Sequence, residues 1–239
     1  MAGHKNSSAN GQEISPEILA KYIRKKILKM SHDAKACHIG SALSCVEIAM
    51  AMTGNKGKLF FSKASGSATI YALMGLDAKH LKENPLLWPG GSLGHGLPIA
   101  VGYALAGNKT LVLMSDAEMN EGTTWESLMF SSQHKLSNLI IVLDKNNLQA
   151  CGKTEDICNI EPLADKLRAF GCEVRKVDGH NFFRLKQALT YPPLYKDKPI
   201  FIIAETTKGK GVGFMEGKYE WHYENLTPAL LKKALKELI

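Results

Sequence analysis

Two polar side chains at the ends of apolar runs could bind a metal ion. Asp116 follows the run 110–114, and Asn146 follows a second run, 139–143, thirty positions further along. Short apolar runs bounded by polar residues are typical of strands buried on both faces of a sheet. Because the carboxyl ends of adjacent parallel strands share one crevice, the two side chains can meet across one strand–helix–strand unit. A carboxylate and an amide oxygen suit Mg²⁺ or Ca²⁺, and Mg²⁺ commonly completes its shell with water and phosphate oxygens.

Two glycine-rich loops could bring the main chain against an anionic ligand. Residues 90–98 precede an expected helix, whose free N–H groups and positive dipole end would favour a phosphate. The second loop, 207–216, is followed by His222, and His38 lies at another turn interrupted by glycine. Taken singly these features are weak, because an aspartate at a strand end is more often a helix cap or turn residue, and a loop histidine is usually solvated. Their order along one chain is what indicates a phosphate- and metal-binding site.

Alternating patterns of helix and strand indicate how these residues are positioned. Apolar, β-branched runs predict buried strands, and apolar residues at helical spacing predict the covering helices. This alternation with short links predicts an α/β protein, three-layered α/β/α with a mainly parallel sheet. The first helix begins at Pro16 with Ser15 as its N-cap. The other expected elements are strands 58–61, 110–114, 139–143, 173–177 and 200–205, and helices 46–52, 99–106, 162–170, 183–189 and one after Gly122.

The composition is that of an ordinary globular chain. Its 239 residues are 45% apolar and 22% charged, with a formal net charge of +7. The lysines are scattered, which favours a solvated surface that attracts anionic ligands over a nucleic-acid-binding face. We expect residues 1–14 to be a disordered leader and residues 15–239 to form the folded domain. Five cysteines without C-x-x-C spacing, no signal-peptide pattern and no apolar run of bilayer length predict a reduced, cytoplasmic protein without a membrane partner.

The metal motif resembles that of the thiamine-diphosphate enzymes, and specifically the N-terminal half of transketolase. That family carries Gly-Asp-Gly, followed one strand later by the Asn of an Asp-x-Asn; this chain reads Ser115-Asp116-Ala117 and Asp144-Lys145-Asn146. The resemblance implies the diphosphate-domain fold, thiamine diphosphate as cofactor, and Mg²⁺ or Ca²⁺ held by Asp116, Asn146 and the backbone carbonyl of Leu148. Ala117 replaces a glycine that lets the backbone approach the diphosphate, so we expect weaker cofactor binding rather than none.

Further segments resemble transketolase motifs in the family's order. By resemblance His38 lines the substrate channel, and His222 reaches the cofactor diphosphate and the donor sugar. Gly91 and Leu93 would pack on the cofactor. Ser65 stands where the family has a histidine that contacts cofactor and substrate. A hydroxyl reaches less far and does not titrate near neutral pH, so this replacement implies a cofactor contact of a different kind and a specialised substrate.

Two acidic residues follow the metal motif. By resemblance Glu121 joins a hydrogen-bonded carboxylate network that links the two cofactor sites of a dimer, and we group it with His38 and His222 as catalytic. The helix dipole would also stabilise an acid at this helix N-terminus. Glu118 is expected to be an additional, more exposed carboxylate near the cofactor. Residues 178–180, Asp-Gly-His, also resemble a family motif and are expected to form a structural turn and helix cap.

The resemblance implies half of an enzyme. Transketolases supply a glutamate to the cofactor's pyrimidine ring from a separate pyrimidine-binding domain, and no counterpart is recognised in this chain. We therefore expect the N-terminal subunit of a split transketolase, which transfers a two-carbon ketol unit from a ketose to an aldehyde, with a sugar or sugar phosphate as substrate. A separate C-terminal subunit would complete it as an α2β2 heterotetramer. Two alternatives stay open: the α-subunit of a 2-oxoacid dehydrogenase, which shares the metal motif, and a non-catalytic binding subunit.

Overall fold

A five-stranded parallel sheet forms the centre of the protein. The computed structural model describes residues 14–83 and 91–239, so the expected leader lies outside the described residues except for Ile14. The strands lie in the order β1-β2-β3-β5-β4, and every neighbouring pair is parallel. They are β1 (Lys58–Phe61), β2 (Thr110–Ser115), β3 (Leu139–Lys145), β4 (Glu173–Asp178) and β5 (Ile200–Glu205). All five expected strands are therefore confirmed, each within two residues of its predicted end.

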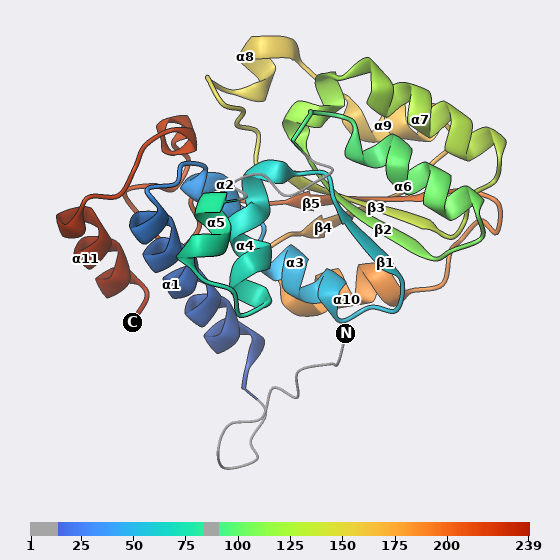
Figure 1. Cartoon of the computed structure of the whole chain (residues 1–239). Helices are drawn as coiled ribbons and strands as arrows, with labels where there is room; N and C mark the ends of the chain where they lie inside the picture. The colour runs from blue at the N-terminus through green and yellow to red at the C-terminus, as the bar shows by residue number, and fades with distance from the viewer. Residues whose placement is uncertain (1–13, 84–90) are drawn as a thin grey trace.

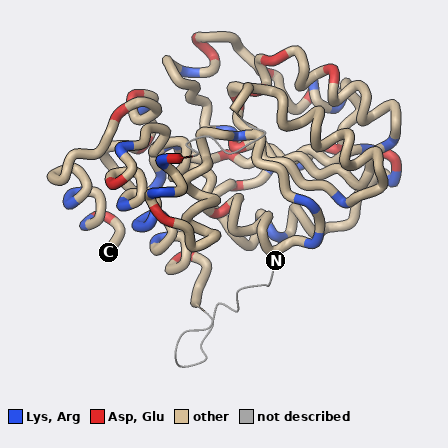
Figure 2. The backbone as a smooth tube through the Cα atoms, in the orientation of Figure 1, with Lys and Arg blue, Asp and Glu red and all other residues tan. Residues whose placement is uncertain are grey.

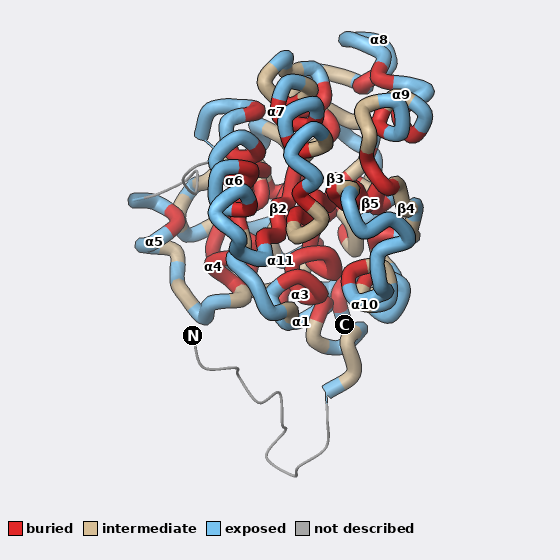
Figure 3. Tube along the Cα trace, turned by 90° about the vertical axis from the view of Figure 1, so that its right-hand side faces the viewer, coloured by how far each residue is buried: buried red, intermediate tan, exposed pale blue. Residues whose placement is uncertain are grey.

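Helices cover both faces of this sheet, as expected for buried parallel strands. Side chains alternate along a strand, so Val112 and Met114 of β2 pack on one side while Leu111 and Leu113 pack on the other. The first side is covered by α6 (Gly96–Leu105), α7 (Gly122–Gln133) and α9 (Leu163–Ala169), and the second by α3 (Val46–Thr53) and α10 (Phe182–Thr190). Figure 3 shows the buried strands between these two layers. The predicted three-layer α/β/α fold is confirmed.

A second group of helices packs beside the sheet and forms its own apolar core. It contains α1 (Pro16–Ala34), α2 (Ile39–Ser44), α4 (Ser67–Leu73), α5 (Ala78–Glu83) and α11 (Pro228–Glu237). Figure 1 shows these helices together on the left of the molecule. Val212, Met215 and Trp221, from the segment that follows β5, are buried in the same core. This packing holds α2 and the segment after β5 against the sheet, where the site is built.

The helix ends follow the sequence signals closely. The Ser15 hydroxyl accepts a hydrogen bond from the N–H of Ile18, and Pro16 occupies the first turn of α1, as predicted. Helix α6 begins at Gly96 rather than at residue 99, because Pro98 fits within the first turn, where its missing N–H would have no partner. The segment after β3 contains a short helix, α8 (Thr154–Cys158), which the pattern does not indicate.

Charged residues are interspersed over the whole chain. Figure 2 shows basic and acidic segments mixed around the sheet, with several basic positions on α1 and α11. Within residues 14–83 and 91–239, no helix is both long enough and apolar enough to cross a bilayer.

Candidate active site

The two predicted metal ligands lie at neighbouring strand ends. The register pairs Ser115 of β2 with Asp144 of β3, so Asp116 and Asn146 leave the same edge of the sheet. Asp116 is only 1% exposed; its carboxylate accepts bonds from the N–H of Ala117 at 3.1 Å and from the Thr154 hydroxyl at 3.4 Å. Burial raises the pKa of Asp116 to about 6, although the charge of Lys63 opposes the shift. The placement of both residues at one edge of the sheet, predicted from the spacing, is thus present, and burial disfavours the charge of the Asp116 carboxylate.

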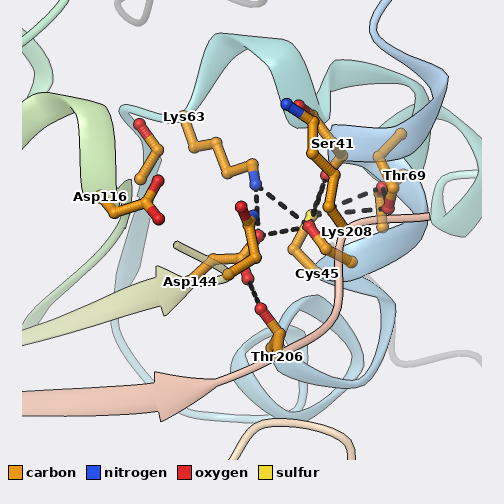
Figure 4. Close-up of polar contacts among 12 residues, drawn as sticks. Ser41, Cys45, Lys63, Thr69, Asp116, Asp144, Thr206 and Lys208 are labelled. Atoms are coloured by element: carbon orange, nitrogen blue, oxygen red, sulfur yellow. Dashed lines mark hydrogen bonds and ion pairs between the residues drawn. The ribbon is translucent and has the colours of Figure 1, made fainter. Parts of the chain in front are cut away.

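Asp144 is held by a buried ion pair and is not available as a metal ligand. The Lys63 ammonium donates to Asp144 Oδ2, and both side chains are fully enclosed. Ser44 of α2 donates to the same oxygen at 2.5 Å, and Thr206, directly after β5, donates to Oδ1. Figure 4 shows Lys63 extending to Asp144, with Asp116 beside it. Asp144 therefore ties β1, α2, β3 and β5 together beneath the site.

A second buried lysine lies at the same edge. Lys208 is 1% exposed, and its ammonium donates to the carbonyl of Gln149 at 2.7 Å. Burial, helped by the charge of Lys63, lowers the pKa of Lys208 to about 8, against the opposing attraction of Asp116 and Asp144. Its Nζ also lies 3.3 Å from His222 Nδ1. Because an ammonium can only donate, Nδ1 accepts, and we assign the His222 proton to Nε2.

The two histidines predicted for the substrate channel lie in contact. The centroids of the His38 and His222 rings are 4.6 Å apart, and the rings meet edge to face. The backbone N–H of His38 also donates to the backbone carbonyl of His222 at 2.8 Å. Burial and the nearby Lys208 charge lower the pKa of His38, and the same two causes lower that of His222 to about 3. Both rings are therefore neutral near pH 7 and offer hydrogen bonds rather than positive charge.

His38 carries an unsatisfied polar atom. Its Nδ1 is buried and makes no hydrogen bond to the described residues, and its backbone is left-handed with φ of 68°. Left-handed backbone is uncommon for a residue with a side chain, and such strain concentrates at functional sites. A buried polar atom without a partner costs free energy unless a ligand or water completes it. These two features fit the expected role of His38 in contact with substrate.

The first glycine-rich loop packs against Glu121. Gly94 has φ of +74°, and a Cβ built there would lie 2.6 Å from the Thr123 hydroxyl and 2.7 Å from Glu121 Cβ, so this position requires glycine. The Thr123 hydroxyl also donates to the Gly94 carbonyl at 3.2 Å. Glu121 itself is partly buried and immediately precedes α7. The glycine-rich loop and the start of α7 are therefore held against each other, and Glu121 lies at their contact.

Glu118 was predicted to be the more exposed carboxylate, and this prediction is wrong. It is 1% exposed, whereas Glu121 is partly exposed. Its Oε2 accepts from the N–H and the hydroxyl of Ser115, at 2.8 and 2.9 Å, and its Oε1 accepts from the Ser62 hydroxyl. Ser62 comes from the end of β1, 56 positions away, and that contact is what makes burial of Glu118 possible. Glu118 thus joins two strand ends.

The remaining predicted cofactor-binding residues lie on three separate segments of the chain. Ser65 is partly buried in the short turn Ala64–Gly66, Gly91 and Leu93 are exposed on the glycine-rich loop, and Ala117 is the second residue of the turn Asp116–Asn120 after β2. The Leu148 N–H donates to Asn146 Oδ1 at 3.1 Å, which orients the predicted amide ligand. Their contacts with a cofactor stay a prediction.

Three residues of the site escape the sequence reasoning. By pattern, Lys63 and Lys208 are indistinguishable from the scattered surface lysines, and nothing marks Thr206 beyond its place after a strand. The available signal is position, since each lysine lies inside a segment that resembles a family motif. Because lysines usually face solvent, the sequence alone does not indicate that these two are buried.

Comparison with known proteins identifies the family. Residues 91–238 match the family model "Transketolase, thiamine diphosphate binding domain". The chain is 31% identical over 263 residues to a protein of Phocaeicola vulgatus that is named as one subunit of apulose-4-phosphate transketolase, with 93% of each chain covered. It is 33% identical over 267 residues to "6-deoxy-6-sulfo-D-fructose transketolase subunit SqwG" of Clostridium sp., with 95% of this chain and 97% of the relative covered.

Solved structures give the same answer for the fold. Transketolase from Campylobacter jejuni superposes with a TM-score of 0.81 at 27% identity, covering 94% of this chain but 43% of that one. The chain therefore spans less than half of a one-chain transketolase but nearly the whole of two relatives that are named as subunits. It belongs to the transketolase family, as a thiamine diphosphate-binding N-terminal subunit of the split type.

Proposed function

We propose that this subunit binds thiamine diphosphate through Mg²⁺ and, with a companion subunit, transfers a two-carbon ketol unit from a ketose to an aldehyde acceptor. One observation carries the proposal. Within the described residues neither the Asp116 carboxylate nor the Lys208 ammonium forms an ion pair, and the two buried charges attract each other across the site, with Lys63 also acting on Asp116. Buried unpaired charges are unfavourable, and a metal–diphosphate pair would neutralise both, the cation facing Asp116 and the phosphate facing Lys208.

The donor set fits a hard cation that also takes ligand oxygens. Asp116 offers a carboxylate, Asn146 an amide oxygen and Leu148 a backbone carbonyl, and Mg²⁺ accepts all three kinds. Among the described residues no cluster of three or more His, Cys, Asp and Glu side chains could hold a metal. A site with one carboxylate and neutral oxygens would therefore depend on phosphate oxygens to complete it, which ties metal binding to cofactor binding. Ca²⁺ would fit the same oxygens.

The other site residues would act on the substrate. Bound thiamine diphosphate supplies the nucleophilic carbon that takes up the ketol unit. His222 would donate from Nε2, since its Nδ1 faces Lys208, and His38 would use its unpartnered Nδ1. Neutral rings can bond to the hydroxyl and carbonyl oxygens of a sugar without placing a fixed positive charge in the channel. Glu121 would join the carboxylate network at the contact between cofactor sites.

A companion subunit has a surface to bind. Helices α6 and α7 pack against one another, and Figure 3 shows exposed positions along both helices. Large apolar residues at exposed positions of these helices are Ile99, Tyr103, Leu105, Met129 and Phe130. Met129 is 60% exposed. Exposed apolar residues gathered on neighbouring helices often mark a protein interface. An assembly of two copies of each subunit is the closed form that would pair these surfaces around two sites.

We expect the isolated subunit to bind thiamine diphosphate only with a divalent cation. Isothermal titration calorimetry with Mg²⁺ should show saturable binding that EDTA abolishes. Thiamine monophosphate is the matched control; it lacks the second phosphate and should bind at least about tenfold more weakly. Equal affinity for the two thiamine phosphates, or binding unaffected by EDTA, would remove the basis for the metal–diphosphate site.

We further propose that Ser65 adapts the channel to a specialised sugar. Two relatives are named for apulose 4-phosphate and for 6-deoxy-6-sulfo-D-fructose, which differ from ordinary pentose phosphates in branching or in their anionic group. In the assembled enzyme, Ser65→His should raise kcat/KM for xylulose 5-phosphate relative to apulose 4-phosphate by roughly tenfold, because one restored hydrogen bond is of that size. Ser65→Ala is the control, since it adds no donor. An unchanged ratio in Ser65→His would rule out this role for position 65.

A further inference from the structure

A buried group of charged side chains lies outside the proposed site. Arg24 of α1 donates to both carboxylate oxygens of Glu47 on α3, each at 2.7 Å, and His180 Nδ1 lies 3.2 Å from Glu47 Oε2. Arg24 and Glu47 are at most 7% exposed. Burial alone would raise the pKa of Glu47, but the hydrogen bonds from His180 and Arg24 outweigh it and lower that pKa to about 2. None of these three side chains has a part in the proposed chemistry.

The hydrogen bonds of His180 define which of its ring nitrogens carries the proton. The Thr207 N–H donates to His180 Nε2 at 2.8 Å, so Nε2 carries no proton. The ring proton is then on Nδ1, where it donates to Glu47. A neutral imidazole in this tautomer connects the carboxylate on one side to a backbone amide on the other. Residues 178–180 are expected from the sequence to form only a turn and a helix cap, and that pattern gives no sign of this second contact.

The backbone N–H that donates to His180 is that of Thr207, and Thr207 belongs to the segment that carries Lys208. Thr206 is fixed on one side by its N–H to the Lys145 carbonyl at 3.0 Å and by its hydroxyl to Asp144. Thr207 is fixed by His180. Lys208 comes next in the chain and places its ammonium among the site residues (Figure 4). Without His180, the Thr207 N–H would lose this hydrogen bond immediately before Lys208.

Arg24 supports the same segment from the other side of Lys208. Gly211 has φ of +90°, and a Cβ built there would lie 3.1 Å from Arg24 Cδ, so the arginine side chain packs against this loop. Arg24 also donates to the Leu43 carbonyl of α2 at 3.3 Å, and Leu43 directly precedes Ser44 in the chain. The buried group therefore contacts the segment both before and after Lys208.

We propose that His180 is a positioning residue: through the Thr207 amide it fixes the backbone that presents Lys208 to the diphosphate. This inference rests on the proposed function, because Lys208 needs an anionic ligand for its placement to matter. A purely structural role would make His180 contribute to stability alone. The positioning role requires that the acceptor at Nε2, rather than the whole ring, sets cofactor affinity.

Two substitutions separate the two halves of the His180 contact. His180→Asn places an amide N–H₂ near the position of Nδ1, so it can still donate to Glu47 but offers no acceptor at Thr207. His180→Gln reaches the position of Nε2 with an oxygen that can accept from Thr207, while its bond to Glu47 is lost. Arg175→Met is the matched control. It breaks a comparable partly buried pair, Arg175–Glu173 at 2.6 Å, which has no hydrogen bond to the segment 206–222.

The experiment measures affinity for Mg²⁺–thiamine diphosphate by calorimetry and protection of the Thr207 amide by hydrogen exchange. The Asn variant should lose amide protection and bind about tenfold more weakly, and the Gln variant should keep both properties nearly at wild-type level. Arg175→Met should lower Tm without changing affinity. Equal affinity in the Asn variant and wild type, or equal losses in the Asn and Gln variants, would overturn the positioning role. Absence of binding by the wild type would instead overturn the proposed function.

Discussion

Replacing Asp116 by Asn should make the subunit more stable and abolish its Mg²⁺-dependent binding of thiamine diphosphate. Burial raises the pKa of Asp116 to about 6, so the folded state holds this carboxylate at a cost whenever it is ionised. The amide keeps the shape and can still accept from the N–H of Ala117. It has no charge to offer a metal. The same change therefore removes a buried charge and the only acidic ligand proposed for the cation.

The pH dependence of this gain has a definite sign. The folded-state pKa of Asp116 lies above the ordinary value of 3.8, so the folded state binds the proton more tightly than the unfolded chain does. Stability contributed by the protonated form is present at low pH and is lost as pH rises to about 6. A shift of about two pKa units corresponds to at most about 3 kcal/mol. Asp116→Asn should thus gain up to about 3 kcal/mol near neutral pH and less than about 1 kcal/mol near pH 4.

Urea unfolding at these two pH values, without metal, measures the gain, and calorimetry measures the loss of cofactor binding. Asp144→Asn is the matched control, because Asp144 is equally buried but paired with Lys63. It should destabilise the protein by about 3–5 kcal/mol, since it leaves a buried ammonium without its partner. A destabilised Asp116→Asn protein, or one that binds thiamine diphosphate as the wild type does, would contradict the assignment of Asp116.

The sheet and its edge could be predicted from the sequence because they depend on local patterns. Residues 111–114 and 139–143 are apolar throughout, which is typical of strands covered on both faces. Once these strands are parallel neighbours, Asp116 and Asn146 must leave the same edge. The start of α1 could be predicted for the same reason, since it depends only on a serine cap and the proline that follows it, within one turn of helix.

The burial of the site's charges could not be predicted, because it depends on partners distant in sequence. Lys63 is enclosed because Asp144 meets it from 81 positions away, and Glu118 because Ser62 meets it from 56. Taken alone, a lysine or glutamate after a strand is expected to face solvent. The contact of His180 with Thr207 is likewise visible only when β4 and β5 lie side by side.

On its own the subunit should show no ketol transfer, and activity should appear when a companion subunit is added. The proposed site would hold a metal, a diphosphate and part of a sugar. By the family resemblance, the glutamate that activates the cofactor's pyrimidine ring comes from the other half of the enzyme. A general acid–base group of this kind contributes at least about a hundredfold to rate, and loss of the enclosing wall adds to that. The two relatives aligned along nearly their whole length are both named as subunits, which supports this expectation.

The most direct test is a reconstitution assay of ketol transfer. The purified protein, a companion chain carrying the pyrimidine-binding half, and an equal mixture of the two are each supplied with thiamine diphosphate, Mg²⁺, a ketose phosphate and an aldehyde acceptor. A mixture made with Asp116→Asn serves as the control for metal-dependent turnover. Turnover is expected only in the wild-type mixture, from a species that light scattering identifies as two copies of each chain. Turnover by the purified 239-residue chain without any companion would contradict this expectation.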